Sequence, residues 1–135
     1  MAYEVNGDAA TFTADTALVA HRLVEVKAAS TTTPPEVNYT DGDADGDQAV
    51  VGVTVEAAAE DASVAVRLLN RGGIVKVTSA VTDITVGQKL YPAASGKITN
   101  VATADSFVGI ALETATADGD VISMLPSLQV LNSGS

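Results

Sequence analysis

The sequence contains an internal repeat that restricts the folds this chain can adopt. Residues 51–68 align without a gap on residues 108–125, at a constant spacing of 57, and seven of the eighteen positions are identical. In each copy two short apolar segments flank an acidic, alanine-rich turn, which predicts a β-hairpin. We therefore expect one supersecondary unit to occur twice and to pack pseudo-symmetrically around a shared core; the alternative is chance similarity in a chain rich in Ala, Val and Thr. The identical pairs are Val51/Val108, Gly52/Gly109, Glu56/Glu113, Ala58/Ala115, Asp61/Asp118, Val64/Val121 and Leu68/Leu125.

The composition also favours β-structure. Val, Ile and Thr make up 39 of the 135 residues, and β-branched side chains suit a pleated surface better than a helix. The length is that of one domain. We expect an all-β domain at residues 18–131, a small β-barrel or β-sandwich, preceded by an extended N-terminal arm at residues 1–17 that shows no regular apolar period. The repeat glycines, Gly52 and Gly109, lie inside apolar strands, where glycine marks a bulge or a close approach of backbones.

Apolar alternation and turn residues place the expected strands. Pro34 and Pro35 cannot continue a β-ladder, so a loop follows the first strand. A turn at Gly72 and Gly73 separates the first repeat from the next apolar segment. The expected strands are residues 18–27, 50–56, 64–68 and 74–77, with two further short strands on either side of a turn at Ser95 and Gly96.

The charge balance argues against nucleic acid and membranes as partners. Seventeen Asp and Glu against seven Lys and Arg give a net charge of -10 at pH 7, and such a field repels DNA phosphates and anionic lipid. The first ten residues have no basic segment, and no apolar run approaches the roughly 20 residues needed to cross a bilayer. We therefore expect a soluble, untargeted chain that binds neither.

The residue inventory argues against catalysis. The chain has no Cys and one His, so a nucleophilic triad would need several distant coincidences. His21 and Glu25 are four positions apart, which on a strand separates them by about 13 Å. Paired carboxylates normally act in a cleft with apolar or aromatic walls, and this chain has only three Tyr and two Phe. We predict no enzyme activity, no catalytic residue and no cofactor.

One acidic segment has partial metal-ligand spacing. Asp41, Asp43, Asp45 and Gly46 match the first positions of a calcium loop. The match then fails, because Gly52 stands where the bidentate glutamate should be. We interpret the segment as an exposed acidic turn, with Ca²⁺ binding by the three aspartates as the alternative.

Four residues are candidate partner contacts. Arg67 and Arg71 lie near the end of the first repeat, and arginine is enriched at protein interfaces; a solvated strand end is the alternative. Tyr3 and Phe12 are apolar side chains of the expected arm, which we expect to become ordered on contact with a partner.

The ordered succession of segments resembles a known family. The segments are VVGVTVEAAAEDASVAVRLL, the Gly72-Gly73 turn with IVKV, ITVGQKLYPAASGKI and VGIALETATADGDVISMLP, spanning Val50 to Pro126. Together they resemble the capsid decoration, or head cement, proteins of bacteriophages and archaeal viruses. The N-terminal arm and the acidic turn lie outside the resembling region.

The resemblance implies a structural role on a virion. It implies a homotrimer on the outer surface of the assembled shell of major capsid protein, which the trimer stabilises without catalytic residues. The alternative is a β-domain for adhesion or ligand binding, for example to a glycan on a virion or cell surface; glycan sites usually present aromatic platforms, and this chain has no Trp.

Overall fold

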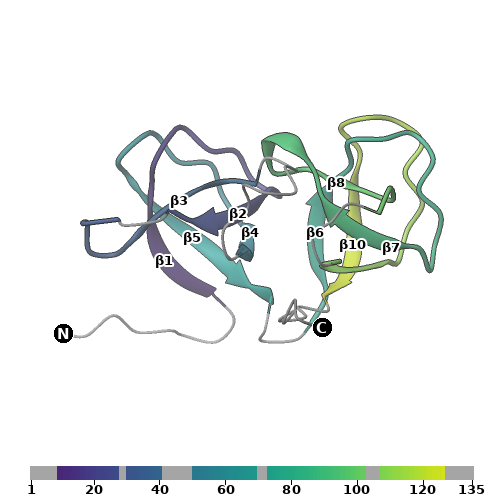
Figure 1. Ribbon diagram of the computed structural model, residues 1–135, viewed down its shortest axis with the longest axis horizontal. Coiled ribbons are helices and arrows are strands. Elements are labelled where there is room, and N and C mark those ends of the chain that lie inside the picture. The colour runs from purple at the N-terminus through teal and green to yellow at the C-terminus, as the bar shows by residue number, and fades with distance from the viewer. Residues whose placement is uncertain (1–8, 28–29, 41–49, 70–72, 103–106, 127–135) are drawn as a thin grey trace.

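The chain is almost entirely β-structure, which confirms the expected fold class (Figure 1). The computed structural model describes residues 9–27, 30–40, 50–69, 73–102 and 107–126. The strands are β1 (Ala9–Ala14), β2 (Leu23–Val26), β3 (Glu36–Tyr39), β4 (Val50–Thr54), β5 (Ser63–Leu68), β6 (Val75–Thr78), β7 (Lys89–Pro92), β8 (Ile98–Thr99), β9 (Gly109–Ala111) and β10 (Val121–Pro126), with a short 3-10 helix, η2 (Ala94–Gly96), between β7 and β8.

The first five strands form a closed barrel in the order β1-β3-β2-β4-β5. β1 closes it, because this strand runs antiparallel to β5 and parallel to β3. Alternate side chains point inward, as the period of a strand requires. The buried core of this first barrel is Ala10, Phe12, Ala14, Leu18, Val24, Val37, Val64 and Val66.

The last five strands form a curled sheet, here called the half-barrel, in the order β6-β10-β9-β7-β8. A single parallel bridge between Ser79 and Ile98 brings β8 to the end of β6. In Figure 1 the half-barrel lies beside the first barrel. Of its strands, β6 is labelled close to the first barrel and β7 farther from it.

The half-barrel repeats the strand pairing of the first barrel. The β1–β5, β2–β4 and β2–β3 pairs correspond to the β6–β10, β7–β9 and β7–β8 pairs. The parallel pair Ala14↔Val37 corresponds to the bridge Ser79↔Ile98. The bridges Leu18↔Ala58 and Ile84↔Ala115 are likewise equivalent. The duplication therefore covers a whole five-stranded unit and extends well beyond the two hairpins detected in the sequence.

The second hairpin contains one extra residue. Glu56 accepts a hydrogen bond from the backbone N–H of Ala65, nine positions on, whereas Glu113 accepts one from Ser123, ten positions on. The gap-free alignment is consequently shifted by one residue in the second strand. Val64, which is buried, corresponds in the structure to the buried Ile122, while Val121 is 46% exposed.

The expected N-terminal arm needs a correction. Residues 9–14 of that segment form β1, which pairs with β5 over five residues and with β3 over two. Phe12 and Ala14 are buried in the first barrel. A strand that closes a barrel has its apolar partners far away in the sequence, so a local search for periodicity does not detect it.

The two units share a packed junction. Leu23 and Val53 point away from the core of the first barrel, and both belong to the buried cluster of the half-barrel. Two hydrogen bonds join η2 to the end of β3: Gly96 donates its N–H to the Thr40 carbonyl at 3.0 Å, and the Thr40 hydroxyl donates to the Ala93 carbonyl at 3.0 Å. The Thr78 hydroxyl also donates to the His21 carbonyl at 2.8 Å.

Glycine is required at this junction. Gly96 has a φ of +71°, and a Cβ there would lie 2.7 Å from the Leu23 carbonyl oxygen. Only a residue without a side chain fits both the left-handed backbone and the close approach. The Arg22 guanidinium donates to the Ser95 carbonyl at 2.9 Å and lies over the Tyr39 ring, 5.7 Å from its centre.

Candidate binding surface

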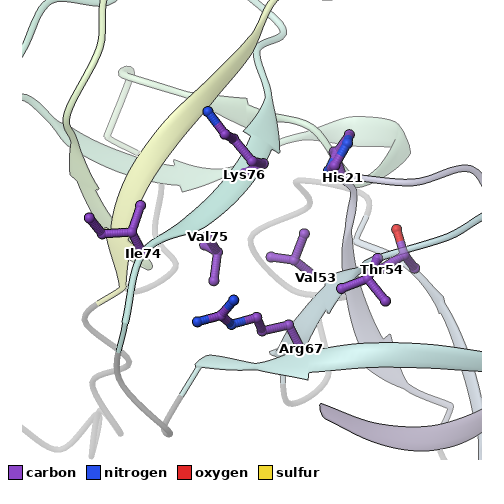
Figure 2. A pocket seen from close by; sticks show the side chains of 8 residues that line it. His21, Val53, Thr54, Arg67, Ile74, Val75 and Lys76 are labelled. Atoms are coloured by element: carbon purple, nitrogen blue, oxygen red, sulfur yellow. The ribbon is translucent and has the colours of Figure 1, made fainter. Parts of the chain in front are cut away.

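A groove lies where the first barrel meets the half-barrel (Figure 2). It encloses about 130 Å³. Both units build it, so the groove exists only when they are packed together. Its walls are His21, Val53, Thr54, Val55 and Arg67 from the first barrel and Ile74, Val75 and Lys76 from the half-barrel.

The groove combines an apolar wall with positive charge. Val55 and Ile74 are 44% and 54% exposed. Figure 2 shows Arg67 extending from β5 towards Ile74 and Val75, with Lys76 further along β6. Among the described residues that line the groove there are two cations and no carboxylate, although the chain as a whole carries a net charge of -10. The Glu113 carboxylate, outside the groove lining, lies 3.6 Å from Lys76.

Lys76 contacts two neighbours, Ser123 of β10 and Glu113 in the turn after β9. Its ammonium donates to the Ser123 hydroxyl at 3.0 Å and lies 3.6 Å from the Glu113 carboxylate. The side chains of Lys76 and Glu113 are 53% and 50% exposed, so water screens this pair strongly. Lys76 remains accessible to a partner.

A tight turn positions the Arg67 side chain. Gly73 has a φ of +83°, and a Cβ there would lie 2.6 Å from an Arg67 terminal nitrogen. The glycine therefore leaves room for the guanidinium beside the connection into β6.

The chemistry of the groove suits binding. An aliphatic side chain can pack on Val55 and Ile74, and a nearby carboxylate can pair with Lys76. Among the described wall residues, the ionisable ones are one His, one Arg and one Lys.

The structure separates the candidate partner contacts. Arg67 lines the groove. Phe12 is instead buried in the first barrel, 7% exposed, because it faces the barrel interior from β1. Tyr3 and Arg71 lie outside the described residues.

The calcium candidates also fall outside the described region: Asp41, Asp43 and Asp45 are not among the described residues. Within the described ranges, no three His, Asp or Glu side chains gather as a metal site. No helix in the part of the chain that the structure covers is long and apolar enough to span a membrane.

The identical glycines and aspartates of the repeat have structural roles in the two hairpins. A Cβ on Gly52 would come within 2.1 Å of the Arg67 carbonyl oxygen, and one on Gly109 within 2.6 Å of the Leu125 carbonyl oxygen. The partner strand therefore passes too closely for any side chain at either position. Opposite Gly52 the register of β2 shifts, as at a β-bulge. Asp61 adopts a φ of +68°, and Asp118 accepts a 2.8 Å hydrogen bond from Lys97.

Sequence reasoning missed most of the groove. Val55, Ile74 and Lys76 were interpreted only as strand residues, and His21 was considered only as a catalytic candidate. The available signal was modest: Ile74 and Lys76 alternate with buried Val75 and Val77, which marks them as outward-facing. What brings them to Val55 and Arg67 is the packing of the two units, which the sequence pattern does not encode.

The fold and the groove together define a class of protein: a double β-unit with a groove at its junction. Residues 5–126 match the family model described as phage cement protein. The chain belongs to the phage cement protein family and is a structural protein of the virion.

Solved structures share the fold. One of them is described as the head fiber gp8.5 N base in bacteriophage phi29, with 18% sequence identity and a TM-score of 0.65. The match covers 88% of this chain and 92% of that chain. No curated protein matches the sequence.

Proposed function

We propose that this protein binds the outer surface of an assembled phage capsid as a homotrimer and stabilises the shell without catalysing a reaction. Membership of the cement protein family over residues 5–126 carries the proposal. Such a protein needs rigid surfaces and no reactive cleft.

The junction groove is the proposed shell contact. Val55 and Ile74 supply exposed aliphatic surface, and Lys76 supplies an accessible cation. We expect it to accept an aliphatic side chain flanked by a carboxylate from a shell subunit. Short-range apolar and ionic contacts of this kind hold a complex together even where the net charges of the partners repel.

Binding to the assembled shell explains the stabilisation. A ligand that binds the shell and not its separated subunits stabilises the shell by about 2.7 kcal/mol per site at a hundredfold excess over Kd. A trimer that contacts several subunits gains further, because its second and third contacts form at a high effective concentration. Modest single contacts are therefore sufficient.

Co-sedimentation with purified shells that lack the protein tests the proposal. The wild type should pellet with the shells and saturate at a fixed number of copies. Ile74→Glu should weaken shell binding at least tenfold. Val101→Glu adds the same charge at an aliphatic residue that is 62% exposed and does not line the groove, and it should bind like the wild type.

Two outcomes would contradict the proposal. If the wild type stays in the supernatant at all concentrations, the protein is not a cement protein for that shell. If Ile74→Glu and Val101→Glu bind equally well, the groove is not the shell contact.

A further inference from the structure

Because the fold is duplicated, the outward face of β2 and β4 in the first barrel can be compared with the equivalent face of β7 and β9 in the half-barrel. In the first barrel, Leu23 of β2 and Val53 of β4 point outward and are 0% and 1% exposed. The half-barrel buries both of them in its own apolar cluster. The outward face of β2 and β4 is thus an interface between two units of the same topology.

The equivalent face of the half-barrel is only partly covered by the residues that the structure describes. Strand pairing makes Lys89 the counterpart of Leu23 and Ile110 the counterpart of Val53, because Leu23↔Val53 corresponds to Lys89↔Ile110. Lys89 is exposed and Ile110 is half-buried. In Figure 1 the label of β7 lies farther from the first barrel than that of β6.

Aromatic side chains gather on this face. The ring of Tyr91 lies 6.5 Å from that of Phe107 in an edge-on arrangement, and the Lys89 ammonium lies 5.2 Å from the centre of the Phe107 ring. Both rings are half-buried. Two of the five aromatic residues of the chain are therefore partly exposed beside a cation, a composition enriched at protein interfaces.

We propose that this distal face, made of Lys89, Tyr91, Phe107 and Ile110, is where a second copy of the chain docks, head to tail. Two observations select a second copy as the occupant. Within the chain, the equivalent face is covered by a unit of the same topology. The position of the buried Leu23 is also taken by a lysine, and this cation offers a short-range partner to carboxylates of a second copy, although the net charges of the two copies, -10 each, repel.

Head-to-tail contact fits the proposed trimer, on which this inference rests. An interface between two different patches closes into a ring when the rotation between copies permits it. In such a ring each copy would use its distal face once and keep its junction groove available for the shell.

Sedimentation velocity of the full chain, with and without shells, tests the inference. Lys89→Glu should weaken self-association at least tenfold and leave the melting temperature unchanged, because Lys89 is exposed. Lys76→Glu makes the same charge change on the same half-barrel outside the distal face, and its self-association should equal that of the wild type. Tyr91→Ala should also shift the mass distribution towards monomer.

The outcomes separate this inference from the proposed function. Equal self-association of Lys89→Glu and Lys76→Glu, or a wild type that stays monomeric at every concentration, would overturn the distal face as a self-contact. If Lys89→Glu changes shell binding without changing the mass in solution, the face binds the shell and the inference is wrong. A wild type that self-associates through this face but ignores shells would instead refute the proposed function.

Discussion

Glu113 accepts a 2.7 Å hydrogen bond from the backbone N–H of Ser123 across the second hairpin. This contact, the Ser123 hydroxyl and the nearby Lys76 hold the pKa of Glu113 below its ordinary value of 4.5. Glu56 makes the corresponding contact with Ala65 in the first hairpin, at 3.3 Å. A carboxylate therefore satisfies the same backbone donor in both copies of the fold.

The lowered pKa of Glu113 predicts a pH dependence of stability. An ionised carboxylate whose pKa is lower in the folded state stabilises the fold above the ordinary pKa, and this stability is lost as the pH falls through the folded-state value. Glu113→Gln retains an acceptor but cannot ionise. Thermal melts between pH 7 and pH 3 should show a smaller loss of melting temperature for Glu113→Gln than for the wild type.

Glu60→Gln is the control, since Glu60 is an exposed carboxylate in the first hairpin turn. Its melting temperature should follow the wild-type curve. Identical curves for the wild type and Glu113→Gln would show that the Glu113 contact contributes nothing to acid sensitivity.

The one-residue shift in the second hairpin predicts opposite effects at neighbouring positions. Ile122 is 2% exposed and Val121 is 46% exposed. Ile122→Ala should lower the free energy of unfolding by about 2–5 kcal/mol, and Val121→Ala should change it by about 0.5 kcal/mol or less. Denaturant titration measures both. A larger loss of stability for Val121→Ala than for Ile122→Ala would show that the gap-free alignment is correct and that the hairpin has no extra residue.

Phe12 is expected to act as a core residue. Phe12→Ala should lower the free energy of unfolding by about 3–5 kcal/mol, because it leaves a cavity in the core of the first barrel. Denaturant unfolding followed by circular dichroism checks this. A variant with wild-type stability and reduced shell binding would show that Phe12 is a partner contact instead.

The junction between the two units predicts a difference between two glycines. Gly96 and Gly87 both have a positive φ, but a Cβ on Gly96 would clash with the Leu23 carbonyl, whereas one on Gly87 meets nothing within 4 Å. Gly96→Ala should cost about 1–3 kcal/mol more than Gly87→Ala, since overpacking adds to the shared backbone strain. Equal costs in denaturant unfolding would mean that the junction tolerates a side chain there.

Local patterns predicted several strands from their own sequences. The expected strands at residues 50–56 and 64–68 match β4 and β5, and the segment at 74–77 matches β6 within one residue. Each is an apolar stretch bounded by turn residues, so its signal is contained in its own sequence.

Strands and sites that depend on contacts between distant segments could not be predicted from local sequence patterns. β1 was interpreted as an arm, and β3 follows Pro35 in a stretch interpreted as a loop. β1 is defined by its pairing with β3 and with the distant β5, and β3 by its pairing with β1 and β2. The groove has the same origin, because Ile74 meets Val55 and Arg67 only through the packing of the two units. Sequence spacing does not specify that packing.

The thermal disruption of shells, with and without added protein, tests the central claim most directly. Shells lacking the protein should break at a higher temperature as the wild type is added, and the increase should saturate when the binding sites are filled, since only binding to the assembled shell shifts that equilibrium. An unchanged disruption temperature at concentrations where the protein co-sediments with the shell would contradict the role of a cement protein.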